Sequence, residues 1–316
     1  MLRSVSAQAG ARLEARCEAM QPSHTEVVTL IAGPGGESAL ADVVVALAAT
    51  LRATPDWLAP GHACDLAFER IEPKAAEAAA RAAIGGTPID VLVQPAAGRR
   101  KRVFVADLES TIIENEMLDE LAEFVGLREH VAEITRRAMN GELDFAAALA
   151  ERVALLKDLP ETVLAEAATR IRLMPGARTL LATLRRAGVT TALVSGGFTV
   201  FAEPIAAELG FDRLVANRLD IADGRIAGTV AAPIVTREVK RDALLALAGE
   251  CGVPLDATLA VGDGANDLPM LEAAGLGIAF RAKPAVAAAA RWRIDHADLT
   301  ALLYVQGYRE AEIIPA

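Results

Sequence analysis

The sequence is poor in cysteine, histidine and aromatic residues, and it contains no long apolar run. There are only three cysteines and four histidines in 316 residues. Cys17, Cys64 and Cys251 lie far apart and form no C-x-x-C motif, which argues against a zinc knuckle or a disulfide framework and favours a reducing cytoplasm. No uninterrupted apolar stretch reaches the roughly 18 residues that cross a bilayer, so we expect no membrane partner.

The chain also lacks an excess of basic residues and a secretory signal. Its 32 Lys and Arg are outnumbered by 42 Asp and Glu. Nucleic acid is therefore not expected as a partner, because phosphate backbones are bound through basic faces. The first residues carry Arg3, Arg12 and Arg16 but no apolar segment of the kind that secretory signals have. An organelle transit sequence is one interpretation, but a disordered extension over residues 1–21, upstream of a later start at Met20, is favoured.

The chain is long enough for two domains, and it is 53% hydrophobic but only 4% aromatic, which predicts an aliphatic, helix-rich core. In the first 95 residues, apolar runs alternate with stripes of apolar residues at helical spacing. They predict a small α/β domain over residues 22–95. A short polar and basic linker follows, as far as residue 102. The predicted elements are strands at 25–32, 63–68 and 89–93 and helices at 38–52 and 74–84.

From residue 103 the pattern changes to short, continuous apolar runs separated by amphipathic helices. Such runs are typical of parallel strands covered on both faces, and we expect residues 96–316 to form an α/β domain with a doubly wound parallel sheet. Ligands bind such sheets at the carboxyl ends of the strands. Residues 115–172 are helical in pattern and predict an inserted helical cap, and Asp223-Gly224 predicts a hairpin turn. The predicted strands are 103–106, 189–194, 214–215, 258–261 and 276–279.

The first chemical motif is DLEST, residues 107–111, directly after a buried strand. Two carboxylates separated by one residue can serve different roles when the loop turns both toward one pocket. Asp107 could attack phosphorus as a nucleophile, and Glu109 could protonate the leaving group and then activate water. The alternative is that these acidic residues only solvate a strand end or cap a helix.

The second motif is GDGAND, residues 262–267, which also follows an apolar strand. Asp263 is a candidate ligand for a hard cation, and the glycines allow a close approach of backbone and ligand. Asn266 and Asp267 would hold a metal-bound water or a phosphate. A glycine-rich turn with incidental aspartates is the alternative interpretation.

Two weaker signals complete the set. Ser195-Gly196-Gly197 follows a predicted strand, and a hydroxyl with free backbone N–H groups at a helix N-terminus can cradle phosphate. Lys240 begins a predicted helix. A single lysine is more often part of a solvated face, but phosphoryl transfer requires a fixed positive charge.

Together, DLEST, SGG, the later lysine and GDGAND resemble the four motifs of the haloacid dehalogenase-like hydrolases. That family transfers phosphoryl groups through an aspartyl-phosphate with magnesium. Additional strings in the cap and around the motifs resemble its phosphoserine phosphatase branch, over roughly residues 100–300. The resemblance implies a Mg²⁺ cofactor and hydrolysis of O-phosphoserine, the last step of serine biosynthesis. These strings are EMLDE at 116–120, RVALL at 152–156, SGGF at 195–198 and GDGANDLPM at 262–270.

The resemblance also implies individual roles. Asp107 would be the nucleophile and a Mg²⁺ ligand, together with Asp263 and the backbone carbonyl of Glu109. In the cap, Glu116 would bind the substrate ammonium and Arg152 its carboxylate. Met139 and Phe145 would line the closed cap, although both also suit an ordinary helix core. The implied phosphoryl-binding residues are Ser195, Gly196, Lys240 and Asn266.

One position departs from the family pattern, because Glu109 stands where aspartate is usual. Glutamate keeps a carboxylate of similar acidity but moves it by one methylene. Related branches also use glutamate here, including phosphotransferases, so hydrolysis is expected while the acceptor stays open. The alternatives are a phosphotransferase, a phosphatase for another small phosphate ester, or a non-catalytic amino-acid sensor.

The first 95 residues weakly resemble an ACT-like ligand-binding domain, which would be regulatory or would scaffold a homodimer.

Overall fold

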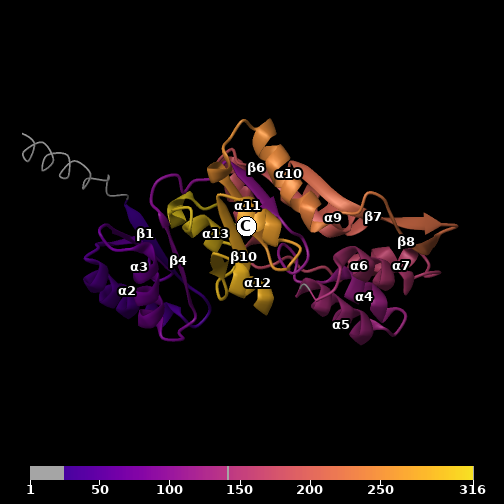
Figure 1. Cartoon of the computed structure of the whole chain (residues 1–316), viewed down its shortest axis with the longest axis horizontal. Coiled ribbons are helices and arrows are strands. Elements are labelled where there is room, and N and C mark those ends of the chain that lie inside the picture. Colours follow the sequence, from indigo (N-terminus) through magenta and orange to yellow (C-terminus); the bar gives the residue numbers. More distant parts are fainter. Residues whose placement is uncertain (1–24, 141, 316) are drawn as a thin grey trace, which may run out of the picture.

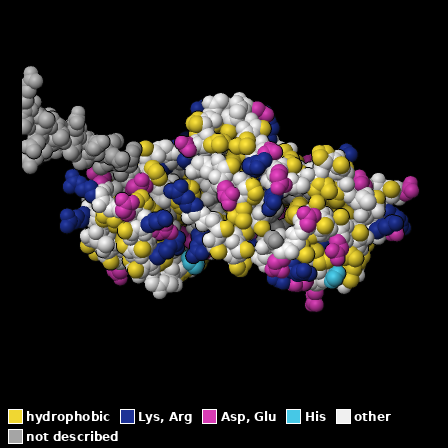
Figure 2. Space-filling model, viewed as in Figure 1, with side chains coloured by type: hydrophobic (Ala, Val, Ile, Leu, Met, Phe, Trp, Pro, Cys, Tyr) yellow, Lys and Arg dark blue, Asp and Glu magenta, His cyan; other side chains and the backbone are white. Residues whose placement is uncertain are grey.

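The structure is a computed structural model that describes residues 25–140 and 142–315. The predicted extension over residues 1–21 lies outside this part. The chain forms one four-stranded sheet and one seven-stranded sheet, followed along the long axis of the molecule by a helical cap (Figure 1). Among the described helices, none combines the length and the apolar character needed to cross a bilayer. Acidic and basic side chains are interspersed over the face seen in Figure 2.

The N-terminal unit is an antiparallel sheet in the order β2-β3-β1-β4, with two helices. Its apolar side chains form a hydrophobic cluster of their own. The sequence analysis missed the short strand β2, which begins at Pro55 and Asp56 and is exposed over its first residues, so it carries no alternating apolar signal. The elements are β1 (Glu26–Ala32), α2 (Glu37–Leu51), β2 (Pro55–Ala59), β3 (Ala63–Phe68), α3 (Pro73–Ile84) and β4 (Ile89–Pro95).

The large sheet has the order β11-β10-β9-β5-β6-β7-β8, and every neighbouring pair is parallel except β7 with β8. The expected doubly wound, mostly parallel sheet is therefore confirmed. The three-residue strand β11 was missed, because so short a run carries no pattern. The strands are β5 (Val103–Ala106), β6 (Thr190–Phe198), β7 (Arg213–Ala222), β8 (Arg225–Ala231), β9 (Thr258–Gly262), β10 (Leu276–Phe280) and β11 (Trp292–Ile294).

Strand β5 explains why both faces of this sheet are covered. Its side chains alternate: Val103 and Val105 pack into one hydrophobic cluster, and Phe104 and Ala106 pack into the other. The first cluster includes α10 (Arg237–Glu250), α11 (Leu268–Ala273) and α12 (Pro284–Ala289). The second includes α8 (Ala177–Arg186), α9 (Thr199–Leu209) and α13 (Ala301–Tyr304).

The cap consists of four helices inserted between β5 and α8, beside the hairpin of β7 and β8 (Figure 1). The hairpin turns at Asp223-Gly224, as predicted. Its second strand holds the cap, since the N–H of Asp158 donates to the carbonyl of Ile226 at 2.9 Å. The cap helices are α4 (Met117–Glu123), α5 (Arg128–Met139), α6 (Phe145–Ala154) and α7 (Thr162–Ala168).

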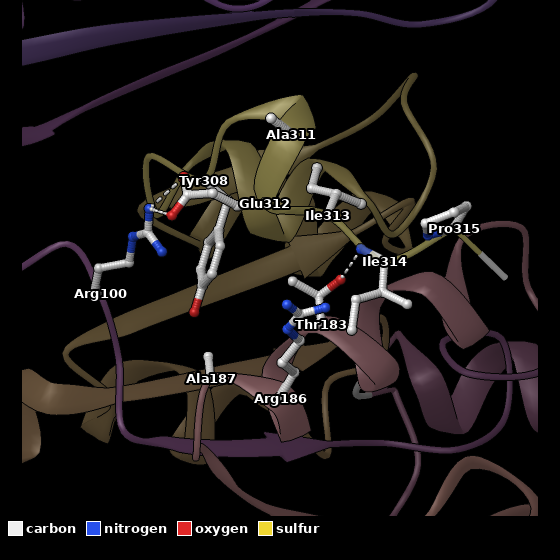
Figure 3. Close-up of a pocket in the computed structure, with 10 residues that line it drawn as sticks. All are labelled: Arg100, Thr183, Arg186, Ala187, Tyr308, Ala311, Glu312, Ile313, Ile314 and Pro315. Atoms are coloured by element: carbon white, nitrogen blue, oxygen red, sulfur yellow. Dashed lines mark hydrogen bonds and ion pairs between the residues drawn. The ribbon is translucent and has the colours of Figure 1, made fainter.

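A seam joins the N-terminal unit to the large sheet. Here the Asp90 carboxylate accepts hydrogen bonds of 2.7–3.2 Å from three successive backbone N–H groups, at residues 295–297. The Trp292 indole donates to the carbonyl of Val93 at 2.8 Å. On another side, the linker residue Arg100 reaches the C-terminal tail, with its guanidinium beside the Glu312 carboxylate and over the Tyr308 ring (Figure 3). The N-terminal unit is thus fixed at the end of the core opposite the cap.

Candidate active site

The order of strands brings the predicted motifs to one edge of the large sheet. Strand β5 lies between β6 and β9, and all three are parallel, so the residues that follow them meet at their carboxyl ends. Asp107 follows β5, and its backbone N–H donates to the carbonyl of Val261 at 3.1 Å. Asp263 follows β9, one residue beyond that strand. Residues far apart in the sequence therefore become neighbours.

Three buried carboxylates form the centre of the site. Asp107, Asp263 and Asp267 each offer an oxygen within 4.8 Å of the others. Lys240 is fully buried, and its Nζ lies 2.7 Å from one oxygen of Asp107 and 2.7 Å from one of Asp267. The default expectation of a solvated lysine is therefore wrong. Asp267 was considered only for water or phosphate contacts, but its carboxylate belongs to the same cluster.

The electrostatics of this cluster favour a cation. Burial, followed by the charge of Asp267, raises the pKa of Asp107 well above its usual range, although Lys240 opposes the shift. Burial raises the pKa of Asp263 to about 7. Conversely, burial would lower the pKa of Lys240, but Asp107 and Asp267 outweigh it and raise that pKa. Because three oxygen donors repel one another at close range, a hard divalent cation fits the donor set.

A buried oxygen supports this fit. The Oδ1 atom of Asn266 accepts no hydrogen bond within the described residues, whereas the Oδ2 atom of Asp263 lies 3.1 Å from the Lys283 ammonium. Buried polar atoms are normally hydrogen-bonded, so the Asn266 oxygen indicates a missing partner. Gly262 allows the tight turn that carries both residues, since a Cβ there would lie 2.4 Å from the Cγ of Asp267.

The loop after Asp107 holds Glu109 against the cap. Three N–H groups, at residues 111–113, converge on the carbonyl of Leu108, and Ser110 adopts a left-handed φ of 54°. This turn directs Glu109 toward α4, where its Oε1 accepts the N–H of Met117 at 2.9 Å. Burial, followed by the charge of Glu116, raises the pKa of Glu109 to about 8. The side chain is therefore a carboxylic acid at neutral pH and can donate a proton.

Two charged side chains of the cap face the same space. Glu116 accepts a hydrogen bond from the Ser110 hydroxyl at 2.7 Å. Arg152 is 3% exposed, and it donates to the carbonyl of Ala148 and to the Thr135 hydroxyl at 3.0 and 2.9 Å. Burial lowers the pKa of Arg152, which nevertheless stays a cation in proteins. The cap thus offers one anion and one cation, both fixed in place.

The SGG motif differs from its expected setting. Strand β6 continues through Phe198, and α9 begins only at Thr199, so Ser195 and Gly196 lie within the strand rather than at a helix N-terminus. Its pairing with β7 is irregular between Val194 and Phe198. The Ser195 hydroxyl accepts the N–H of Gly197 at 2.9 Å. The motif therefore lies on an irregular strand end, and its role as a phosphate cradle stays a prediction.

The glycines of this motif make room for their neighbours. A Cβ at Gly196 would lie 2.7 Å from the Phe145 ring, and a Cβ at Gly197 would lie 3.0 Å from the Glu109 carboxyl. The glutamate at position 109 therefore fits because residue 197 has no side chain. Phe145 does lie at the cavity, whereas the prediction for the Met139 side chain falls outside the described structure.

Most of the predicted residues line one small cavity of about 20 Å³, which holds roughly one water molecule. Ser195 and Lys240 do not line this cavity directly. The lining residues are Asp107, Glu109, Glu116, Leu118, Phe145, Leu149, Arg152, Gly196, Asp263 and Asn266.

The sequence analysis missed Lys283, whose Nζ lies 3.1 Å from the Oδ2 of Asp263 and 4.0 Å from the Oε1 of Glu116. The sequence around it shows only a lysine before a proline, shortly after an apolar run.

Known proteins are similar to this chain in sequence. The family model described as haloacid dehalogenase-like hydrolase matches residues 104–272. The phosphoserine phosphatase SerB2 of Mycobacterium tuberculosis is 48% identical over 227 residues, which cover 71% of this chain and 56% of that protein. The phosphoserine phosphatase of Streptococcus thermophilus is 46% identical over 199 residues, 63% of this chain and 93% of that protein.

A solved structure is similar as well. It is described as a phospho-aspartyl intermediate analogue of phosphoserine phosphatase, and it aligns with a TM-score of 0.63 and 40% identity over 65% of this chain and 98% of its own. The chain spans little more than half the length of the Mycobacterium tuberculosis protein. The residues that the family model matches, 104–272, include the cap and strands β6 to β9 of the large sheet.

Proposed function

Because this chain belongs to the haloacid dehalogenase-like hydrolase family, we propose that it is a phosphoserine phosphatase that acts through an aspartyl-phosphate on Asp107. The single observation that carries the proposal is the meeting of Asp107, Asp263 and Asp267 around Lys240, in a buried cavity that the cap closes. Relatives at 44–48% identity are phosphoserine phosphatases. Every position at which the family motifs require a charged residue carries one in this chain, which weighs against a non-catalytic sensor.

In the first half of the reaction, a carboxylate oxygen of Asp107 attacks the phosphorus of phosphoserine. The bond from phosphorus to the serine oxygen breaks, and Glu109 donates its proton to that leaving oxygen. The pKa of about 8 keeps Glu109 protonated at neutral pH before this step. Lys240 offsets negative charge on the phosphoryl oxygens, aided by Ser195 and Gly196.

In the second half, the ionised Glu109 accepts a proton from a water molecule. The resulting hydroxide attacks the phosphorus of the aspartyl-phosphate, so phosphate leaves, Asp107 is restored and Glu109 is protonated again. The hydrogen bond between Glu109 and the N–H of Met117 fixes the carboxyl group on the side of the cap. One side chain can thus exchange the proton in both halves.

The residues that would hold Mg²⁺ are Asp107, Asp263 and the backbone carbonyl of Glu109, with Asp267 beside them. When bound, this cation supplies positive charge that stabilises the phosphoryl oxygens. Its charge would also keep the aspartates ionised, which their crowding otherwise opposes.

The cap supports an amino-acid substrate. We propose that Glu116 binds the ammonium group and Arg152 the carboxylate of phosphoserine, because the two side chains present opposite charges to the same cavity. A sugar phosphate has neither group. Since the cavity holds only about one water molecule, the cap must open to admit substrate.

The test is a comparison of phosphate release from phosphoserine, phosphothreonine and a sugar phosphate, with and without MgCl₂. We expect release to require MgCl₂ and to be fastest with phosphoserine. Equal rates on all three substrates would refute the substrate assignment, and release without a divalent cation would refute the mechanism.

A phosphotransferase is the second candidate, and the observation that favours it is Glu109 itself. Its carboxyl group is displaced by one methylene relative to aspartate and is anchored on α4. Such a displacement can change which acceptor approaches the aspartyl-phosphate. Adding an excess of serine or homoserine to the assay separates the candidates: transfer would yield a new phosphate ester, whereas hydrolysis yields only inorganic phosphate.

We further propose that residues 22–95 and 96–316 are separate domains, with a cap at about 115–172. The independent hydrophobic cluster of the N-terminal unit supports this division. An ACT-like regulatory role for that unit is a hypothesis that calorimetric titration of the protein with serine tests. If serine produces no heat of binding that can be assigned to the N-terminal unit, that unit is a scaffold rather than a regulatory domain.

A further inference from the structure

Among the described residues, Lys283 is the one cation that touches the predicted site but has no role in the chemistry above. Its Nζ lies 3.1 Å from the Oδ2 of Asp263 and 4.0 Å from the Oε1 of Glu116. Its side chain is 30% exposed, so the ammonium is partly shielded from solvent. It therefore bridges a predicted metal ligand of the core and a predicted substrate ligand of the cap.

The backbone fixes Lys283 in this position. The N–H of Lys283 donates to the carbonyl of Asp263 at 3.0 Å, and Pro284 confines the lysine to an extended conformation. On the other side, Arg281 donates to the carbonyls of His296 and Ala297 at 3.3 and 3.1 Å. The loop after β10 is thus held at both ends, which places the lysine beside Asp263 without relying on its flexible side chain.

The charge balance of the cavity gives this lysine its significance. Five carboxyl groups gather here: Asp107, Glu109, Glu116, Asp263 and Asp267. Lys240 bridges Asp107 and Asp267, and Arg152 is held by the cap. Of the other three, Glu109 accepts the N–H of Met117, whereas Asp263 and Glu116 form ion pairs only with Lys283 within the described residues.

We propose that Lys283 sets the charge of the cavity through its ion pairs with Asp263 and Glu116. Its ammonium stands in for part of the positive charge when no cation is bound, and it shifts the site toward anions. The inference rests on the proposed function, in which Asp263 holds a divalent cation. A fixed positive charge near a binding site weakens the binding of cations and strengthens that of anions.

This role has a signature that a merely structural contact would not produce. Replacing Lys283 by an uncharged residue should change the affinities for a cation and for an anion in opposite directions. Loss of local structure would instead weaken both. The measurement is therefore a pair of calorimetric titrations of the K283M variant and the wild-type protein, first with MgCl₂ and then with inorganic phosphate at saturating MgCl₂. About pH 8.5 keeps proton competition for the carboxylates small.

We expect K283M to bind Mg²⁺ roughly tenfold more tightly and phosphate roughly tenfold more weakly than the wild-type protein. K283R keeps the positive charge, so its affinities for Mg²⁺ and for phosphate should be close to those of the wild-type protein. K283Q supplies a second neutral variant if K283M does not fold. The matched control is K101M, which removes another partly buried lysine, one that donates to the carbonyls of Gly98 and Asp256 at 2.9 and 2.7 Å. K101M should leave both affinities unchanged.

Two results would overturn the inference: both affinities weaken together in K283M and K283Q, or neither changes. Failure of the proposed function is recognised separately. If the wild-type protein itself binds no Mg²⁺, the proposed function fails and this inference with it. If the wild-type protein binds Mg²⁺ and the neutral variants match it, only the role of Lys283 fails.

Discussion

Two of the regions where the molecule buries carboxylates are the cavity and the seam between the N-terminal unit and the large sheet. At the seam, Asp90 accepts hydrogen bonds from three backbone N–H groups and forms no ion pair with Lys or Arg within the described residues. At the cavity, Asp107 and Asp267 share the Lys240 ammonium, and the Oδ2 of Asp263 lies 3.1 Å from the Lys283 ammonium. Both regions desolvate acidic groups, but the seam satisfies one carboxylate with backbone N–H groups, whereas the cavity crowds several carboxylates together.

This difference separates a structural carboxylate from a functional one. Burial raises the pKa of Asp90, and the hydrogen bonds from residues 295–297 counteract that shift. At the cavity, neighbouring carboxylates add to the effect of burial, and the pKa of Asp107 rises well above its usual range. Buried acids that repel one another carry a cost in stability that a bound cation would relieve. Substitutions at the cavity should therefore change phosphate release, whereas substitutions at the seam should change the free energy of unfolding.

The largest effect is expected at Asp107. Asp107→Asn removes the attacking oxygen, so phosphate release should fall by at least about a thousandfold, while circular dichroism stays that of a folded protein. The loss of activity is measured as the rate of phosphate release from phosphoserine under saturating MgCl₂. Activity that survives this substitution would contradict the mechanism, and the carboxylates of the cavity could then no longer be called functional.

Truncating the cap arginine should act on one class of substrate. Arg152→Ala should raise KM for phosphoserine by an amount equivalent to about 2–5 kcal/mol, because the substrate carboxylate loses a desolvated partner. KM for an aryl phosphate, which has no such carboxylate, should change little. Arg136→Ala is the matched control, since that arginine lies exposed on the same cap and pairs with Glu133. Equal effects of Arg152→Ala on both substrates would count against the assignment.

The pH dependence should report Glu109. Its pKa of about 8 lies above the ordinary value, so the protonated form that donates to the leaving group dominates below about pH 8 and is lost above it. With phosphoserine, kcat/KM should fall by about tenfold per pH unit beyond that point. An aryl phosphate needs less proton donation, so its decline should be shallower. The same decline in Glu109→Gln would show that another group titrates.

The smallest effect on activity is expected at the seam. Asp90→Asn replaces two acceptor oxygens by one and should lower the free energy of unfolding by about 1–3 kcal/mol, with kcat/KM within about twofold of wild type. Asp42→Asn, at an exposed position on α2, is the control for loss of a charge. Thermal unfolding and phosphoserine turnover measure the two quantities. A large loss of turnover in Asp90→Asn would show that the seam is coupled to the cavity.

The sequence predicts the large sheet well because its strands are buried on both faces and read as continuous apolar runs. Strand β2 and strand β11 escaped prediction, since the first is half exposed and the second is only three residues long. The Asp223-Gly224 hairpin was readable from its turn residues, but its contact with the cap was not. Local patterns define elements, whereas contacts between distant elements depend on tertiary packing.

The site shows the same division. Asp107, Glu109, Asp263 and Asn266 could be found because they stand in motifs at strand ends, and the structure gathers them at one cavity. Lys283 could not, because its contact with Asp263 arises from the adjacency of β9 and β10 rather than from any local pattern. The strand setting of the SGG motif was also unreadable, as two glycines more often end a strand than continue it.

The central claim is that Asp107 and Asp263 share one divalent cation beside Lys240. Anomalous diffraction from crystals soaked in MnCl₂ tests it most directly, because manganese replaces magnesium at oxygen-ligand sites and marks its own position. The account predicts one strong peak in contact with both carboxylates, and no such peak in an Asp263→Asn variant. A peak elsewhere in the molecule, or separate pockets for the two aspartates, would contradict it.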